Sequence, residues 1–376
     1  MSSKNKEEDN LSYKPDWNPK TGAEEFAVKI VKGVSRVTIP HTNLHKTKKT
    51  LSTEELVDGV LQNNRTILAK TITLIESASE KHQEHAREIL TKLIPHSCKS
   101  IRIGITGVPG AGKSTLIESL GLFLIKNNHK VAVLTIDPSS TVTKGSILGD
   151  KTRMEQLSRE ENCFIRPSPS GGTLGGVARK TRETIIACEA AGYDVILIET
   201  VGVGQNEVTV RSMVDFFLLV LIPGGGDELQ GIKKGIMELV DAIAINKADG
   251  DNIRLAETSC NNYSNALHYL LPATKGWIPI AMTCSAVTKK GVEDLWNLIQ
   301  KFENKIKKSG IFYERRKQQS IDWMFDMINN EIKDKFYNNK EIKKELKNSI
   351  ESIEKGNLLP TSAAQKLISL YFKIKN

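Results

Sequence analysis

An α/β fold with a mainly parallel β-sheet, covered by helices on both faces, is predicted by three features of the sequence. Short apolar runs alternate with amphipathic helical patterns from residue 101 to residue 305. The first run leads into a glycine-rich loop and then directly into a helical pattern. Further polar motifs follow later apolar runs, at the carboxyl ends of the predicted strands. Ligands of such a sheet bind at that edge.

Two segments precede the predicted sheet. Residues 1–50 are expected to be a flexible N-terminal segment, which begins with a polar, charged and proline-bearing stretch. Residues 51–98 are expected to be a helical region, because Ser52–Glu55 fits a capping box before an apolar helical pattern. A second helix is predicted at Glu84–Leu93, and Pro95 ends it.

The nucleotide-binding domain is predicted to cover residues 99–308. Apolar runs indicate strands at 101–105, Val131–Ile136, Val195–Ile198, Phe216–Leu221, Ala242–Ile245 and about Ile278–Thr283. Helical patterns include the one with Leu116, Ile117 and Leu120, then Lys151–Glu160, Gly176–Ala191, Leu229–Leu239, Asn252–Leu270 and Val292–Lys305.

Residues 309–376 are predicted to be a wholly helical C-terminal arm. Apolar residues with i, i+3, i+4, i+7 spacing are Ile321, Met324, Phe325 and Ile328, and again Ala364, Leu367, Ile368 and Tyr371. A capping-box pattern from Ser362 to Gln365 stands at the second stripe. Two interpretations remain open: a helical lid on the same domain, or an arm that packs against another subunit in a homodimer.

Composition excludes several classes of protein. No apolar run is long enough to span a membrane, and the N-terminus resembles neither a secretory signal nor a transit peptide, so a cytoplasmic location is expected. Five scattered cysteines without a C-x-x-C pair indicate reduced structural thiols, and the seven histidines form no His-rich tract, so a dedicated transition-metal site is not expected. The net charge of +9 comes from lysines interspersed with acids, which favours solvated helix faces over nucleic-acid binding.

The glycine-rich loop has the sequence G-x-x-x-x-G-K-S from Gly107 to Ser114. Between a strand and a helix, this pattern is a phosphate-binding loop, and the fold is therefore predicted to be that of a P-loop NTPase. Backbone N–H groups surround a polyphosphate, Lys113 reaches its β and γ oxygens, and Ser114 coordinates Mg²⁺. The predicted phosphate-binding residues are Gly107, Val108, Pro109, Gly110, Ala111, Gly112, Lys113, Ser114 and Thr115.

The base is predicted to be guanine. Asn246, Lys247 and Asp249 form an N-K-x-D motif directly after the apolar run Ala242–Ile245. An aspartate at the edge of guanine accepts from the ring N–H and the exocyclic amine, a donor pair that adenine lacks. Ser285 and Ala286 follow the next predicted strand and fit the loop whose backbone N–H contacts the guanine carbonyl oxygen. The predicted ligand is therefore GTP or GDP, with Mg²⁺.

Two carboxylates end predicted strands beside the phosphate loop. Asp137 is positioned to approach the Mg²⁺ sphere, and Glu199 resembles the switch that senses the γ-phosphate. Val203 stands where small GTPases have the glutamine that orients water, while Gln205 lies farther along. We therefore expect slow intrinsic hydrolysis that a partner modulates. A glycine-rich stretch farther along contains Asp227, whose carboxylate can reach the nucleotide or another subunit.

Seven motifs occur in order: GVPGAGKST, DPSS, KGSILGDKTRM, FIRPSPSGGTLGGVARKTRE, ETVGVGQNE, PGGGDELQGIKKGIMEL and NKADGDN. Together they resemble the MeaB/ArgK group of metallochaperone-type P-loop GTPases, which are associated with methylmalonyl-CoA mutase. The resemblance covers residues 50–310. It implies a GTPase that gates delivery of adenosylcobalamin to a cobalamin-dependent acyl-CoA mutase, protects the mutase from inactivation, and forms a homodimer through C-terminal helices.

The resemblance also assigns roles to residues of this sequence. It implies Mg²⁺ or first-switch roles for Asp137 and Asp150, a second-switch role for Glu199, and a third-switch role for Asp227 and Lys233. The implied catalytic residues are Lys113, Asp150, Glu199 and Lys233, and the implied metal ligands are Ser114, Asp137, Asp150 and Glu199. Three positions depart from the family pattern, namely Lys144, Asn206 and Gly225, and none of them is a proposed phosphate or base ligand.

Three other functions are weighed against this one. An ATPase or kinase serving lysine/arginine/ornithine transport is opposed by the guanine motif. An RNA- or ribosome-binding GTPase has only the basic C-terminal region in its favour. A nickel or zinc metallochaperone needs Cys or His clusters, whereas Cys163 and Cys188 stand alone near the predicted switches. The sequence leaves open which mutase is the partner.

Overall fold

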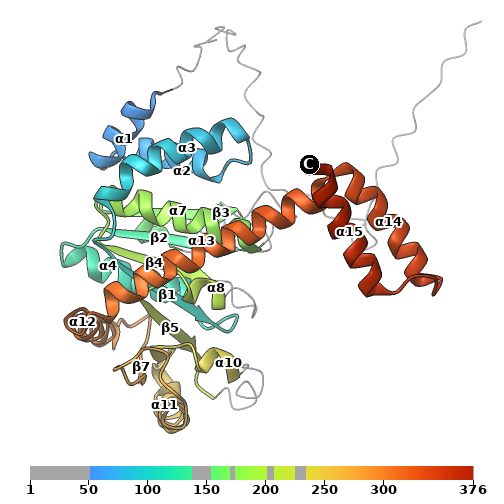
Figure 1. Ribbon diagram of the computed structural model, residues 1–376. Coiled ribbons are helices and arrows are strands. Elements are labelled where there is room, and N and C mark those ends of the chain that lie inside the picture. The colour runs from blue at the N-terminus through green and yellow to red at the C-terminus, as the bar shows by residue number, and fades with distance from the viewer. Residues whose placement is uncertain (1–50, 138–153, 170–173, 201–206, 225–233, 376) are drawn as a thin grey trace, which may run out of the picture. The chain divides into compact units, whose positions relative to one another are not determined.

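The computed structural model describes residues 51–137, 154–169, 174–200, 207–224 and 234–375 (Figure 1). These residues belong to one compact unit that begins at Leu51. The predicted N-terminal segment 1–50 lies outside the described residues.

Within the described residues, a single sheet contains seven strands that pair in parallel, in the order β3-β2-β4-β1-β5-β6-β7 (Figure 1). The strands are β1 (Ile101–Gly107), β2 (Val131–Asp137), β3 (Cys163–Pro169), β4 (Val195–Thr200), β5 (Phe216–Leu221), β6 (Ala242–Ile245) and β7 (Ile280–Thr283). Strand β1 lies in the centre, between β4 and β5, so the loop after it opens at the middle of the carboxyl edge. The predicted fold class is confirmed.

Helices cover both faces of the sheet. The described helices are α1 (Thr53–Leu61), α2 (Arg65–Glu76), α3 (Glu80–Leu93), η1 (Ile94–His96), α4 (Lys113–Lys126), α6 (Glu155–Arg159), α7 (Leu174–Ala190), α8 (Glu207–Arg211), α10 (Lys234–Met237), η3 (Gly250–Asn252), α11 (Ile253–His268), α12 (Val292–Lys308), α13 (Ile311–Asn338), α14 (Lys340–Glu354) and α15 (Pro360–Lys375). Helix α7 contacts α1, α2 and α3, whereas α4 contacts α12.

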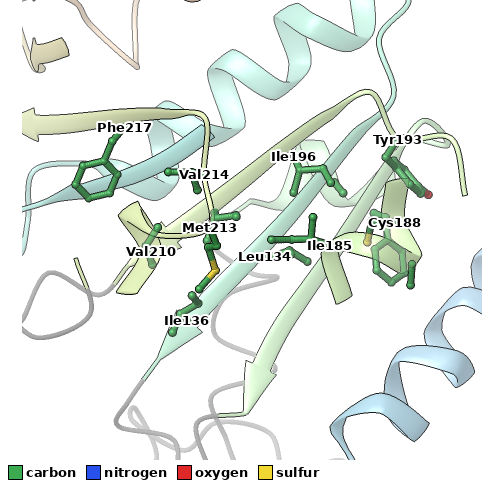
Figure 2. Close-up of a cluster of buried hydrophobic side chains, with 14 of the residues drawn as sticks. Leu134, Ile136, Ile185, Cys188, Tyr193, Ile196, Val210, Met213, Val214 and Phe217 are labelled. Atoms are coloured by element: carbon green, nitrogen blue, oxygen red, sulfur yellow. The ribbon is translucent and has the colours of Figure 1, made fainter. Parts of the chain in front are cut away.

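The alternation of side chains along the strands divides the core into two apolar clusters, one on each face. On β4, Ile196 and Ile198 belong to the cluster beneath α7, and Val195 and Leu197 belong to the cluster beneath α4. Figure 2 shows the first cluster, where side chains of β2, β4, β5 and α7 meet. Because both faces are buried, the central strands read as continuous apolar runs, as expected for a parallel sheet.

Strand β3 is absent from the sequence-based prediction. Its residues, CFIRPSP, include a charged side chain and two prolines, which obscure an apolar pattern. β3 lies at the edge of the sheet and pairs only with β2 among the described strands. Proline is tolerated on an edge strand because one side of it needs no ladder partner.

The N-terminal region contains three helices rather than the two predicted. The capping box at Ser52 is confirmed: its hydroxyl accepts from the Glu55 N–H, and the Glu55 carboxylate accepts from the Ser52 N–H at 2.8 Å. The additional helix, α2, begins at Arg65, and the side chain of Asn64 caps it. The predicted capping box at Ser362 is wrong, because α15 already begins at Pro360 and Ser362 lies inside its first turn.

Helix α13 is fixed to the sheet by buried ion pairs. The Arg316 guanidinium donates to both carboxylate oxygens of Asp215, at 2.9 and 2.6 Å, and Asp215 lies just before β5. Asp215 also accepts from the Arg102 N–H of β1 at 2.8 Å, and Arg102 pairs with Glu189 at 2.9 Å. These contacts lie at the edge of the sheet opposite the phosphate loop, so they attach the C-terminal helices without occupying the ligand edge.

Candidate nucleotide-binding site

The phosphate loop connects the end of β1 to the start of α4. Gly107 has φ 151° and Gly112 has φ 81°, conformations that side chains rarely adopt. A Cβ on Gly107 would lie 2.0 Å from the carbonyl oxygen of Val220, and one on Gly112 would lie 2.7 Å from Asn246 Nδ2. The two fixed glycines of the motif are therefore required by close backbone and side-chain approach, whereas a Cβ on Gly110 would meet nothing within 4 Å.

Lys113, the first residue of α4, is 7% exposed. Its ammonium donates to the carbonyl oxygens of Gly107 at 2.8 Å and Val108 at 3.1 Å. The positive charge is thus held against the loop, next to the partial positive charge of the α4 N-terminus. A bound polyphosphate is a stronger acceptor than a neutral carbonyl, so the arrangement fits phosphate binding at this loop.

Ser114 and Glu199 place two oxygen donors beside the phosphate loop. The Ser114 hydroxyl donates to a Glu199 carboxylate oxygen at 2.8 Å, although 85 residues separate them in sequence. Glu199 is the penultimate residue of β4, and its side chain is partly exposed. A hydroxyl and a carboxylate together are the oxygen ligands that Mg²⁺ prefers, and Mg²⁺ completes its shell with water and phosphate oxygens. The residues present therefore fit a magnesium ion.

Asp137 ends β2 at the same edge of the sheet, where its backbone pairs with Pro169. The remaining predicted switch residues, Asp150, Asp227 and Lys233, lie outside the described residues. Among the residues that the structure describes, no group of three or more His, Cys, Asp or Glu side chains is placed to hold a metal ion.

Asn246 joins the three loops of the site. It is 1% exposed; its Nδ2 donates to the Ala111 carbonyl at 2.8 Å, and its Oδ1 accepts from the Ala286 N–H at 3.0 Å. Beside it lies Cys284, and burial raises the pKa of this thiol to about 12, so it stays protonated. Asn246 thus acts as a structural tie between the phosphate loop, the N-K-x-D loop and the Ser285–Ala286 loop.

Asp249 and Ser285 also meet. The Ser285 hydroxyl donates to the Asp249 carboxylate and accepts from the Thr288 N–H at 3.1 Å. Asp249 remains partly exposed, and Lys247 is exposed with φ 60°. The left-handed backbone at Lys247 turns the loop between Asn246 and Asp249, so that the first side chain points into the protein and the carboxylate stays accessible. This is the arrangement that recognition of a guanine edge requires.

One pair in the site was missed by the sequence-based analysis. Thr106 and Thr200, on β1 and β4, form a hydrogen bond at 2.9 Å between buried hydroxyls. Each residue stands next to a predicted site residue, Gly107 and Glu199 respectively. A polar residue at the end of an apolar strand is the feature of the sequence that could have indicated them. Only the strand order shows that Thr106 and Thr200 are neighbours.

A phosphate loop at the centre of a seven-stranded parallel sheet, tied through Asn246 to an N-K-x-D loop, defines this protein as a P-loop GTPase. Residues 68–341 match the family described as methylmalonyl Co-A mutase-associated GTPase MeaB. The chain belongs to this family.

Curated and solved relatives agree with the family. The GTPase ArgK of Escherichia coli is 43% identical, over 83% of this chain and 95% of its own length. The mitochondrial methylmalonic aciduria type A homolog of Mus musculus is 40% identical, over 88% of this chain and 82% of its own. A crystal structure described as an LAO/AO transport system kinase superposes with a TM-score of 0.70 at 36% identity, covering 85% of this chain and 97% of that one. In the described residues, no helix is long and apolar enough to cross a membrane.

Proposed function

We propose that this protein binds and hydrolyses GTP as a chaperone of a cobalamin-dependent acyl-CoA mutase of the methylmalonyl-CoA mutase type. In this role it gates the loading of adenosylcobalamin and protects the mutase from inactivation. The observation that carries the proposal is the pair of hydrogen bonds made by Asn246. They join the phosphate loop and the N-K-x-D loop into one site, in a chain that belongs to the mutase-associated family.

The residues of the site have distinct roles in this proposal. Lys113 and the backbone of the phosphate loop bind the β and γ phosphates, and Asp249 with the Ala286 N–H recognises guanine. Ser114 and Glu199 hold Mg²⁺, which neutralises charge on the phosphate oxygens when it is bound. Asp137 and Asp150 complete the metal site, and Lys233 supplies charge from the third switch.

The proposed hydrolysis is slow without a partner. Val203 stands where small GTPases have the glutamine that orients the attacking water. A GTPase without this group retains its nucleotide state until a partner changes the site, which suits a protein that reports on the loading of another enzyme.

The C-terminal helices support a homodimer. On α13 the predicted apolar stripe is solvent-exposed in the single chain: Met324 is 49% exposed, Phe325 56% and Ile328 45%. Further along, Ile332 of α13 and Phe372 of α15 are exposed as well. The alternative of a lid on the same domain would bury this stripe against the sheet domain. A second copy of the chain is therefore the proposed partner of the α13 face.

The central experiment measures binding to a purified methylmalonyl-CoA mutase by calorimetry, with GDP, with a non-hydrolysable GTP analogue and without nucleotide. We expect complex formation whose affinity depends on the nucleotide, and transfer of adenosylcobalamin to the apo-mutase that requires GTP hydrolysis. Absence of a complex under all three conditions would refute the mutase assignment. An isobutyryl-CoA or ethylmalonyl-CoA type mutase serves as the comparison that identifies the partner.

A second candidate is favoured by one observation, the description of the solved relative as a transport system kinase. The two functions differ in the base that they require, since a kinase of this kind uses ATP. Competition between ATP and GTP for the site distinguishes the two functions. Because of the N-K-x-D loop, we expect a strong preference for GTP.

A further inference from the structure

Thr106 and Thr200 form a buried hydroxyl pair between the two central strands of the sheet. Thr106 is 1% exposed, Thr200 is completely buried, and the Thr200 hydroxyl donates to Thr106 Oγ1 at 2.9 Å. The pair contributes no atom to the surface of the candidate nucleotide site. It lies directly beneath that site, because Thr106 precedes the phosphate loop and Thr200 follows Glu199.

The pair stands where the backbone ladder between β1 and β4 ends. The register of these two strands runs from Ile101 opposite Val195 to Ile105 opposite Glu199, while Thr200 pairs with Ile136 of β2 and Thr106 with Leu219 of β5. The hydroxyl bond lies one residue beyond the last register pair of β1 and β4. It adds a side-chain link between the strand that enters the phosphate loop and the strand that carries the Glu199 carboxylate.

Glu199 and Thr200 are consecutive residues of β4, so their side chains point to opposite faces of the sheet. Val195 and Leu197 point to the face covered by α4, and Glu199 continues this alternation, in agreement with its hydrogen bond to Ser114. Thr200 points to the opposite face, together with Ile196 and Ile198. A bond on one face thus resists rotation of the strand end and keeps the neighbouring carboxylate directed to the other face.

We propose that Thr200 is a positioning residue for the magnesium site, acting through Thr106 to hold the Glu199 carboxylate at the Ser114 hydroxyl. The inference rests on the proposed function, because it assumes that Ser114 and Glu199 are the residues that hold Mg²⁺. Loss of the Thr200 hydroxyl leaves the guanine loop and the phosphate loop intact. It removes the side-chain link between β4 and β1 while the backbone pairing of Thr200 with Ile136 of β2 remains, so the site retains nucleotide but holds the metal less well.

The test compares Thr200→Val, which keeps the shape and removes the hydroxyl, with Thr200→Ser, which keeps the hydroxyl. Thr71→Val is the matched control: Thr71 is equally buried, on α2, and its hydroxyl has no hydrogen-bond partner among the described residues. The measurement is the dissociation rate of a fluorescent GDP from the full-length protein, once with excess Mg²⁺ and once with EDTA. The rate in EDTA divided by the rate with Mg²⁺ gives the effect of the metal on GDP release.

We expect Mg²⁺ to slow GDP release from the unsubstituted protein and Thr200→Val to reduce this ratio by about fivefold, the effect of one neutral hydrogen bond. The rates in EDTA should stay within about twofold of each other, and Thr200→Ser should restore most of the ratio. Thr106→Val should reproduce the effect of Thr200→Val. The double variant should be no worse than either single one, because both remove the same bond.

Two results would overturn the inference: an unchanged ratio in Thr200→Val and Thr106→Val, or an equal fall in Thr71→Val, which would indicate general loosening of the core. If the unsubstituted protein fails to bind GDP, or binds it without any effect of Mg²⁺, the proposed function itself fails instead. Thermal unfolding of each variant is recorded first, and the rates are compared well below the lowest transition. Should Thr200→Val not fold, Thr106→Val carries the same comparison.

Discussion

The Ser114 hydroxyl donates a hydrogen bond of 2.8 Å to the Glu199 carboxylate, joining the first turn of α4 to the end of β4. Under the proposed function, both residues would hold Mg²⁺ through oxygen lone pairs, and the Ser114 proton could still be donated to the Glu199 carboxylate. Arrival of the metal is thus coupled to the strand end from which the second switch begins.

Glu199→Gln is expected to lower the rate of GTP hydrolysis by about 100-fold. The neutral amide still accepts from Ser114, so the fold is preserved, but it no longer supplies negative charge to the metal. GDP affinity in EDTA should be unchanged. Single-turnover hydrolysis over a range of Mg²⁺ concentrations provides the measurement. Glu155→Gln, at an exposed position of α6, is the control and should hydrolyse GTP normally.

Lys113→Ala should reduce affinity for GTP by about 100-fold or more, because a charge-assisted contact to the phosphates is lost inside a buried loop. The control is Lys126→Ala, at the exposed end of the same helix, which should bind GTP as the unsubstituted protein does. Equilibrium titration with a fluorescent GTP analogue measures both. Hydrolysis that survives Lys113→Ala would place the active site elsewhere.

Asp249→Asn is expected to change the preferred base. The amide cannot accept from both guanine donors, so GTP affinity should fall by about 100-fold. Xanthine carries a carbonyl in place of the exocyclic amine, and the new amide can donate to it, so xanthosine triphosphate should bind better than GTP. Competition between the two nucleotides measures the preference. Asp251→Asn, two residues along at an exposed position, should leave it unchanged, and equal preference in both variants would contradict the role of Asp249.

Motifs that are contiguous in sequence could be located in advance. Gly107 to Ser114 and the N-K-x-D residues are recognisable because a loop that touches a ligand must supply several groups within a few positions. The alternation of apolar runs with helices likewise predicted the parallel sheet, and the structure confirms it. Strand β3 was not predicted, because an edge strand buries less apolar surface and can carry Arg166, Pro167 and Pro169.

Contacts between distant segments could be predicted only where a motif implies them, as for Asn246 and the phosphate loop. Thr106 meets Thr200 across 94 residues, and Arg316 meets Asp215 across 101. Neither pair has a spacing rule, because the partners are brought together by strand order and helix packing rather than by local geometry. The same holds for the Ser114–Glu199 bond: each residue was predicted to hold Mg²⁺, but not that the two would bond directly.

Asp215→Asn should destabilise the protein by about 3 kcal/mol at neutral pH, because it removes the carboxylate that Arg316 contacts at 2.6 Å and leaves this buried guanidinium only the Glu189 carboxylate, at 3.6 Å. Burial raises the pKa of Asp215, but the charge and hydrogen bonds of Arg316 lower it more, and the net pKa lies below its usual value. The stabilisation by Asp215 is therefore complete above the pKa of the unfolded chain and disappears as pH falls through the folded pKa.

The measurement is the free energy of unfolding in urea from neutral pH down to acid pH. The difference between the unsubstituted protein and Asp215→Asn should shrink as the solution becomes more acidic. Glu331→Gln removes an exposed ion pair with Lys335 and should cost about 0.5 kcal/mol or less at any pH. A difference for Asp215→Asn that stays constant with pH would contradict the assigned pKa direction.

Phe325→Asp together with Ile328→Asp is expected to convert the proposed homodimer to a monomer. Both side chains are about half exposed on α13, so the single chain tolerates a charge there, whereas an apolar interface does not. Each replaced apolar side chain removes about 1.5 kcal/mol or more per subunit from the favourable free energy of dimerisation. The dimer dissociation constant should therefore rise at least about 100-fold. Sedimentation over a range of concentrations measures this, with circular dichroism to show that the helices persist. Tyr269→Asp replaces another exposed aromatic residue, at the end of α11, and should leave the dimer intact. A protein that is monomeric before any substitution would instead assign the α13 face to the mutase, and the double variant would then lose mutase binding.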